Sequence, residues 1–247
     1  MIRPLETCTV EIAGRSIEVD IRRNPRARRL ILRVNPWPGS ATLVTPRFID
    51  QKRAQRFVHE HSGWLTEKLA LQPDPVSFSD GAEIPFRGRL HRLVSLAEPR
   101  GALVCANDEI RVPGGPTHLN RRLTEWLKRE ARTAITASVQ EHAAAFERTP
   151  SRITVRDQKS RWGSCSPNGN MSFSWRLIMA PPEILDYVCA HEAAHLAQMN
   201  HGHKFWQLIK HRIADPDSAN QWLNQRGSEL HRYGIAGGLA PAQTPLP

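Results

Sequence analysis

A short segment, HEAAHLAQMNHGHKFW at residues 191–206, carries four histidines and one glutamate. His191 and His195 are four residues apart, so on a helix both imidazoles lie on one face, one turn apart. Two imidazole nitrogens placed in this way can both bind one zinc ion at about 2.0–2.1 Å. Glu192 follows His191 and can reach a water on the metal without binding the metal itself. This pattern predicts a helical zinc site in which Glu192 is the general base of a hydrolase.

Two histidines at this spacing can also belong to an ordinary amphipathic helix, so the motif needs support from its surroundings. Ile184 and Val188 precede the two histidines on the same helical stripe, which should therefore be buried. Buried imidazoles need partners. We therefore favour a metal ion, one zinc per chain, over a plain helix.

The third metal ligand must come from outside this helical turn, and His201 and His203 are the candidates. An unbroken helix would carry His201 about 9 Å along the axis beyond His195 and onto another face. The chain must therefore leave the helix near residues 198–200, where Asn200 tolerates a left-handed conformation. We expect His201 to complete the site. His203 should begin the next helix and either cap it or lie behind the metal ligands.

Residues 1–115 are predicted to form a basic N-terminal part, rich in antiparallel sheet and α+β in character. Short apolar and polar runs between residues 7 and 46 predict strands, with turns at Gly14 and at Pro38-Gly39. The segment 48–71 has the apolar spacing of a helix.

Residues 116–235 are predicted to form the catalytic part, which is mainly helical. A long amphipathic helix should run from about residue 119 to 146. A hairpin should turn at Asn168-Gly169, and Pro181-Pro182 should open the helix that carries the metal motif. Two further helices should follow, separated at Asp215-Pro216. Strands and helices together predict an α+β fold.

The charge of the chain suggests affinity for anions but does not name one. The formal net charge is +10, and part of it lies in RRNPRARRLILR at residues 22–33. This run is either a strand with solvated arginines or an anion-binding patch, and the sequence favours neither.

Other features of the composition bear on location. The four cysteines are scattered, without the spacing of a metal finger. No apolar run approaches the roughly 18 residues of a membrane span, and the first residues lack the apolar core of a signal peptide. We expect a cytoplasmic chain without membrane contact, and a disordered tail at residues 236–247.

The segment from Arg156 to Trp206 resembles the YgjP-like metallopeptidase family, zincins related to the SprT-like group. In that family a WGSC hairpin, here residues 162–165, precedes the H-E-x-x-H helix, and the third zinc ligand lies in an Asn-His element before an aromatic pair. The resemblance extends over nearly the full chain and implies a zincin-like fold, with His201 as the third ligand. Metzincins share the spacing from His195 to His201 but place glycine where this chain has Gln198.

The segment KSRWGSC is a candidate for the sheet edge, or the cleft wall, against which zincins hold a peptide substrate. Gly163 permits close approach of a backbone, and Ser164 can offer a hydrogen bond. On the plainer interpretation Trp162 packs in the core and the basic residues, Arg176 included, face solvent. The candidate substrate-binding residues are Arg156, Lys159, Arg161, Trp162, Gly163, Ser164 and Cys165.

Three functions remain open at this point. The preferred one is a zinc-dependent peptidase with a protein or peptide substrate. A nucleoside triphosphate hydrolase would use the arginines and lysine to stabilise phosphoryl charge, although the chain lacks a Gly-rich phosphate loop. A metal-stabilised module that binds nucleic acid is the third, but such a module would not need Glu192.

Overall fold

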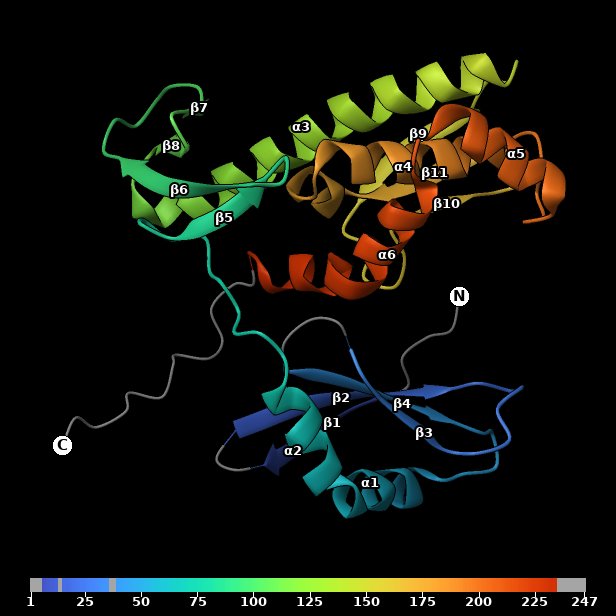
Figure 1. The fold of residues 1–247 in the computed structure, drawn as a ribbon. Helices are drawn as coiled ribbons and strands as arrows, with labels where there is room; N and C mark the ends of the chain where they lie inside the picture. Colours follow the sequence, from blue (N-terminus) through green and yellow to red (C-terminus); the bar gives the residue numbers. More distant parts are fainter. Residues whose placement is uncertain (1–5, 13–14, 36–38, 235–247) are drawn as a thin grey trace. The chain divides into compact units, whose positions relative to one another are not determined.

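The computed structural model describes residues 6–12, 15–35 and 39–234, and these combine helices with three sheets, which confirms the α+β fold (Figure 1). The chain divides between Asp74 and Pro75 into two compact units. The predicted turn residues Gly14 and Pro38 and the predicted disordered tail 236–247 lie outside the described residues. In the described part, no helix is both long and apolar enough to cross a membrane.

The N-terminal unit is a four-stranded sheet of order β1-β2-β4-β3 with two helices. Its pairs are antiparallel except for β2 and β4, which run parallel. The elements are β1 (Glu6–Ile12), β2 (Arg15–Arg23), β3 (Ile31–Val34), β4 (Ser40–Thr45), α1 (Gln51–Glu60) and α2 (Ser62–Ala70).

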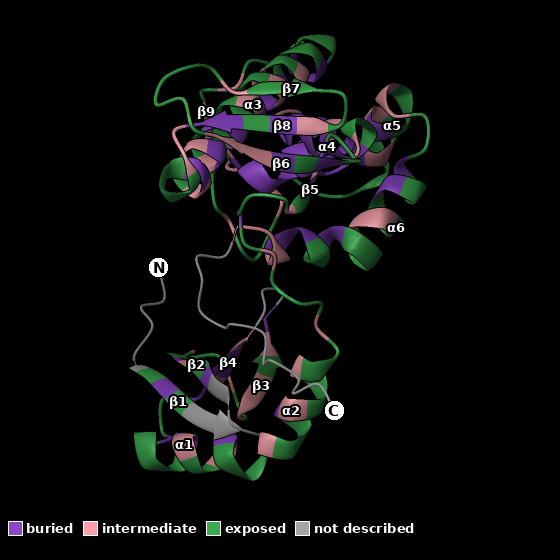
Figure 2. Cartoon of the chain, turned by 90° about the vertical axis from the view of Figure 1, so that its left-hand side faces the viewer, coloured by how far each residue is buried: buried purple, intermediate pink, exposed green. Residues whose placement is uncertain are grey.

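The core of this unit lies between the sheet and the helices. Val19 and Leu43 from the strands and Val58 and Leu65 from the helices are all fully buried. Most of α1 is exposed (Figure 2). The helix predicted over residues 48–71 is interrupted at His61, whose Nδ1 lies 2.9 Å from the carbonyl oxygen of Phe57.

The second unit contains two sheets, of orders β5-β6-β8-β7 and β10-β11-β9, and the helices that carry the metal motif. Its strands are β5 (Glu83–Phe86), β6 (Arg89–Leu96), β7 (Val104–Ala106), β8 (Glu109–Pro113), β9 (Arg152–Arg156), β10 (Gly163–Cys165) and β11 (Asn170–Ser174). Its helices are α3 (Pro116–Ala145), α4 (Pro182–Ala194), α5 (His203–Arg212) and α6 (Pro216–Arg226), with the 3-10 segments η1 (Trp175–Met179) and η2 (Gly227–Arg232).

Residues 75–115 belong to the second unit, whereas the sequence predicts that they belong with the N-terminal part. Ile84, Leu93 and Ile110 from this segment are fully buried in the same core as Leu123 of α3. The sheet β5-β6-β8-β7 therefore has its apolar partner in the helix that follows it. Such a partnership depends on contacts between distant residues, which a local strand pattern does not reveal.

The local elements predicted around the motif are confirmed. The long helix is α3, with Leu123 and Ile135 fully buried on its apolar stripe. The hairpin of β10 and β11 turns at Gly169, whose φ of 72° is one that glycine adopts readily. Pro182 is the first residue of α4, and α5 and α6 are separate helices.

Polar contacts join α4 and α5 to α3. Nε2 of His142 lies 2.9 Å from Oδ1 of Asp186, and the Ser138 hydroxyl donates to the same oxygen at 2.7 Å. Nε of Arg212, at the end of α5, donates to Nδ1 of His142 at 3.1 Å, and its Nη2 contacts Glu141 at 2.6 Å. These contacts hold α4, which carries His191 and His195, and α5, which follows His201, against the same helix α3.

Candidate metal centre

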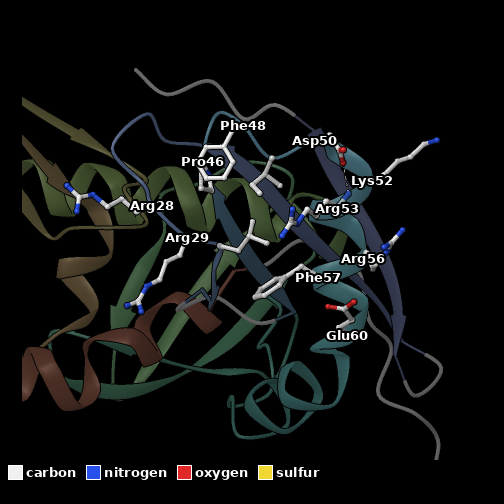
Figure 3. A pocket seen from close by; sticks show the side chains of 12 residues that line it. Arg28, Arg29, Pro46, Phe48, Asp50, Lys52, Arg53, Arg56, Phe57 and Glu60 are labelled. Carbon is white, nitrogen blue, oxygen red and sulfur yellow. Dashed lines mark hydrogen bonds between the residues drawn. The ribbon is translucent and has the colours of Figure 1, made fainter.

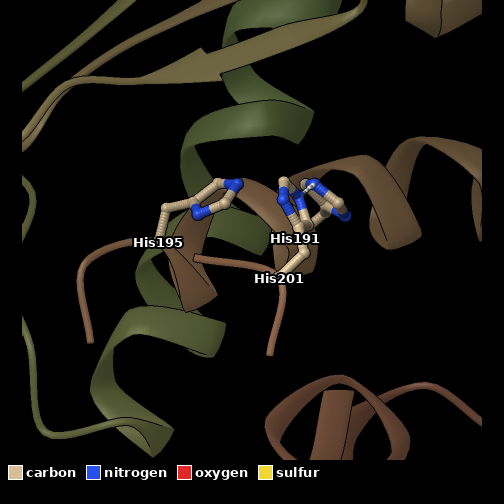
Figure 4. A group of neighbouring side chains, drawn as sticks. All are labelled: His191, His195 and His201. Atoms are coloured by element: carbon tan, nitrogen blue, oxygen red, sulfur yellow. Dashed lines mark hydrogen bonds between the residues drawn. The ribbon is translucent and has the colours of Figure 1, made fainter. Parts of the chain in front are cut away.

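His191, His195 and His201 lie together, with one ligand nitrogen from each within 4.8 Å of the other two (Figure 4). The Nε2 atoms of His191 and His201 are 3.0 Å apart. Two nitrogens bound tetrahedrally to zinc at about 2.0–2.1 Å are separated by roughly 3.3 Å. The three imidazoles therefore fit a single zinc ion, and among the described residues they are the group that can hold one.

A tight reversal after α4 brings His201 back toward the helix. The helix ends at Ala194, with His195 as its C-cap, and the N–H of Gln198 donates to the Ala194 carbonyl at 2.8 Å. The chain therefore leaves the helix earlier than the predicted residues 198–200. Asn200 does not adopt the expected left-handed conformation, since it is not among the residues with positive φ.

The same reversal fixes the ring of His195. Nδ1 of His195 lies 3.1 Å from the carbonyl oxygen of Gln198. A carbonyl oxygen can only accept, so Nδ1 carries the proton and Nε2 is left as the ligand atom. The backbone carbonyl of Gln198 thus orients the His195 ring.

His203 takes no part in the three-histidine group. It is the first residue of α5, as predicted, but no side-chain hydrogen bond caps that helix. The preceding Gly202 is the N-cap residue and has an extended backbone, with φ −80° and ψ −176°. The helix α5 therefore begins at His203 without a side-chain cap.

Phe205 of α5 packs against all three histidines. Its ring centroid lies 5.0 Å from that of His191, 4.8 Å from His195 and 4.6 Å from His201, and the side chain is fully buried. The ring thus packs against each of the three imidazoles and restricts their movement. Trp206 adds a second ring near His191 and His201, with centroids 6.3 and 6.1 Å away.

The electrostatic surroundings favour neutral imidazoles. Burial, followed by the nearby His195 and His201, lowers the pKa of His191 from 6.5 to about 4. Burial also lowers the pKa of His195. Neutral imidazole is the form that binds a metal, so at neutral pH these histidines are in the state that a zinc site requires.

Glu192 is buried against the backbone of β10. A Cβ on Gly163 would lie only 2.6 Å from Cγ and 2.7 Å from Oε1 of Glu192. The backbone N–H of Cys165 donates a hydrogen bond to the carboxylate. Burial raises the pKa of Glu192 from 4.5 to about 7, although the positive charge of Arg161 and the Cys165 N–H both lower it. A carboxylate in this environment is suited to proton transfer near neutral pH.

A cavity of about 180 Å³ opens beside this carboxylate. Strand β10 and the residue before it form one wall, α4 another and α6 a third. Its lining residues are Trp162, Gly163, Tyr187, Val188, His191, Glu192, Asn220 and Leu223. A reacting group inside it would therefore meet both a metal ligand and the candidate base.

A scan against protein-family models matches residues 28–226 to the YgjP-like family, described as a metallopeptidase domain. The chain belongs to the YgjP-like metallopeptidase family. The match reaches from the N-terminal unit to the end of α6, includes the three histidines, and confirms the resemblance predicted from the WGSC and H-E-x-x-H segments. Searches of curated proteins and of solved structures gave no match.

Within the family domain, the WGSC segment lies beside the candidate base, as its position before the metal helix suggests. Trp162 and Gly163 line the cavity. Ser164 pairs with Ser172 inside the hairpin. Cys165 contributes its backbone N–H to Glu192, while burial and the Glu192 charge raise the pKa of its thiol to about 11.

The predicted basic residues are more dispersed. Arg156, Lys159 and Arg161 are all exposed, and none of them lines the cavity. Only Arg161 is close enough for its charge to lower the pKa of Glu192. The three side chains therefore do not meet in one anion-binding cluster at the cavity.

Arg176 is buried and has a structural role, so it does not face solvent or the cavity. Its Nε donates to Asp157 at 2.9 Å, and its Nη1 donates to the carbonyls of Leu230 at 3.0 Å and Tyr233 at 2.7 Å. The side chain thus ties η1 to the segment that follows α6, and its charge is neutralised by Asp157.

Besides Val188, which the helical stripe already placed beside the histidines, three lining residues were not predicted from the sequence. Tyr187 lies one helical turn before His191, a spacing that could have marked it as a neighbour of the site. Asn220 and Leu223 come from α6, far along the chain, and only the tertiary fold brings them to the cavity. Asn220 adds a carboxamide that can both donate and accept hydrogen bonds.

The contact between Gly163 and Glu192 leads to a direct prediction. We expect Gly163→Ala to lower hydrolytic activity by roughly 10²-fold, because displacement of a catalytic group by about 1 Å has that effect. Overpacking should also lower the free energy of unfolding by about 1–3 kcal/mol, measurable by urea denaturation. Gly202→Ala is the matched control, since a Cβ there meets nothing within 4 Å. Full activity in Gly163→Ala would contradict the close packing of this wall.

His231 predicts a pH dependence of stability. It is buried and its ring stacks on Trp162, with centroids 5.1 Å apart. Burial and the charge of Arg176 lower its pKa from 6.5 to about 4, against the opposing effect of Asp157. Below pH 6.5 the unfolded chain therefore binds a proton that the folded chain does not, and the stabilisation present above pH 6.5 is lost as the pH falls toward 4.

We expect this histidine to lower the free energy of unfolding by about 2 kcal/mol between pH 7.5 and pH 5. Urea denaturation of the metal-loaded protein at both pH values measures the change. The variant His231→Gln, which does not titrate, should lose less stability over the same interval. An identical pH dependence in the variant would show that His231 does not contribute.

Proposed function

We propose that this chain is a zinc-dependent peptidase in which His191, His195 and His201 hold one zinc ion and Glu192 is the general base. The observation that carries the proposal is the position of the Glu192 carboxylate, buried between the three-histidine helix and the backbone of β10. A structural metal site has no need of a buried carboxylate whose pKa is raised to about 7.

Each residue has a role in hydrolysis. A zinc ion bound at the three histidines would act as a Lewis acid that activates water and polarises a carbonyl group. Glu192 accepts a proton from the attacking water and then delivers it to the leaving amine. The Cys165 N–H orients the carboxylate, and Phe205 holds the imidazoles.

The free edge of the small sheet offers a place for a peptide. In the order β10-β11-β9, strand β10 is an edge strand. Alternate residues of a strand direct their backbone groups to the same side. Since the N–H of Cys165 points to Glu192, the N–H and C=O of Gly163 point the same way and can pair with an extended substrate beside the metal.

Two other functions have less support. In a triphosphatase, cations must contact the phosphoryl oxygens, but the residues that line the described cavity include no lysine or arginine. In a purely structural metal module, Glu192 would have no task. A cytoplasmic location stays a prediction from the sequence.

The test is a parallel assay of zinc-loaded protein on an unfolded, fluorescently labelled protein and on nucleoside triphosphates. We expect peptide-bond cleavage and no phosphate release. Release of phosphate that requires both the metal and Glu192 would overturn the peptidase proposal.

Single replacements of the exposed cations sharpen this distinction. For a peptidase, Arg156→Ala, Lys159→Ala and Arg161→Ala should each change kcat/KM by only a few-fold. For a triphosphatase, loss of a cation that stabilises the transition state should cost about 2–4 kcal/mol, or roughly 30- to 1,000-fold. Losses of that size in phosphate release would favour the nucleotide function.

A further inference from the structure

The N-terminal unit contains an open groove of about 860 Å³, which we call the basic groove (Figure 3). One side is formed by residues 28–30, another by residues 46–50, and the third by α1. The groove lies wholly within this unit, so nothing in the metal centre accounts for it.

Five cations surround the basic groove. Arg28 and Arg29 lie on one side and Lys52, Arg53 and Arg56 on α1, and all five side chains belong to exposed residues (Figure 3). None of them forms an ion pair with another described residue. Like charges gathered around one hollow repel each other, and an anionic ligand would relieve that repulsion.

The groove also contains acidic residues, and one of these is already engaged. Asp50 caps α1, its Oδ1 accepting the N–H of Arg53 at 2.7 Å. Glu60 lies at the last turn of the same helix. The balance of the lining is therefore positive, with Asp50 partly neutralised by the helix N-terminus.

Aromatic rings lie between the cations. Phe48 is 76% exposed and lines the groove, and Phe57 is half-buried and stacked on His61 with centroids 4.1 Å apart. Proteins that bind single-stranded nucleic acid combine an exposed aromatic ring with nearby cations. The bases stack on the ring while the phosphates of the backbone contact the cations. The carboxylates of an acidic peptide would contact the cations but would leave the Phe48 ring without a stacking partner.

We propose that the basic groove binds single-stranded nucleic acid. Arg28, Arg29 and the cations of α1 contact phosphates, and Phe48 stacks on a base. The arginines of the basic run at residues 22–33 therefore have different roles. Arg22 forms an ion pair with Asp20 at 3.3 Å, whereas Arg28 and Arg29 line the groove. A duplex hides its base faces and is a poorer ligand for this arrangement.

Fluorescence anisotropy with the full chain and a labelled, mixed-sequence 12-nucleotide strand tests the proposal. We expect single-stranded DNA or RNA to bind more tightly than the matching duplex or a poly-glutamate peptide. Arg53→Ala/Arg56→Ala should weaken binding at least tenfold and reduce the slope of log K against log salt by about 1.4. Phe48→Ala should weaken binding roughly 5- to 100-fold without changing that slope. Phe48→Trp, which keeps an aromatic ring, should retain the affinity of the parent protein.

The matched control is Arg129→Ala/Arg132→Ala, which removes the same charge from exposed positions on α3. Its affinity should stay within twofold of the parent protein. Equal loss in this control would show a general charge effect and overturn the proposal. Unchanged affinity in Phe48→Ala, tighter binding of duplex or poly-glutamate, or no binding at all would overturn it as well.

Discussion

Replacing Glu192 by glutamine is expected to lower the rate of hydrolysis by about 10²-fold or more while zinc stays bound. Glutamine has nearly the same size, and its carbonyl oxygen can still accept the hydrogen bond from the N–H of Cys165. It cannot take up the proton of the attacking water. Binding of the metal and catalysis should therefore separate, which elemental analysis and a cleavage assay on the same preparation will measure.

A matched control lies on the same helix. Glu183 is an exposed residue in the first turn of α4, so Glu183→Gln makes the same chemical change away from the cavity. Its activity should stay close to that of the parent protein. If Glu192→Gln also kept activity within a few-fold, Glu192 would not be the base.

The second large effect concerns the metal ligands. We expect one zinc per chain in the parent protein, and loss of most of that zinc in each of His191→Ala, His195→Ala and His201→Ala. Each change removes one of the three nitrogens that converge on the site, and a second water cannot replace an imidazole that the fold holds in place. Metal content after gel filtration gives the stoichiometry of every variant.

His203→Ala serves as the control, because His203 is exposed at the start of α5 and lies outside the three-histidine group. This variant should keep its zinc. If His201→Ala retained full zinc while His203→Ala lost it, the third ligand would be His203, and the reversal after α4 would have to differ from the one described.

Local patterns predicted much of the architecture around the site. The stripe of α3, the turn at Gly169 and the start of α4 at Pro182 each depend on residues close in sequence. The convergence of His201 on the helix was also predictable, because a straight helix cannot bring it there. The conformation of the chain reversal could not be predicted, because it depends on the hydrogen bond between His195 and Gln198.

Other features depend on contacts between distant residues. Charge counting cannot tell that Arg176 is buried against Asp157 while Arg161 stays exposed. Nor does any local pattern indicate that α6 brings Asn220 to the cavity. The packing of Phe205 against the histidines likewise follows from the position of α5.

The most direct test of the metal centre is X-ray diffraction at the zinc absorption edge from crystals of the zinc-loaded protein. We predict one anomalous peak per chain, about 2.0–2.1 Å from a nitrogen of each of His191, His195 and His201, with Glu192 near the metal but not bound to it. A peak held by other residues, coordination by the Glu192 carboxylate, or no peak at the three histidines would contradict this account.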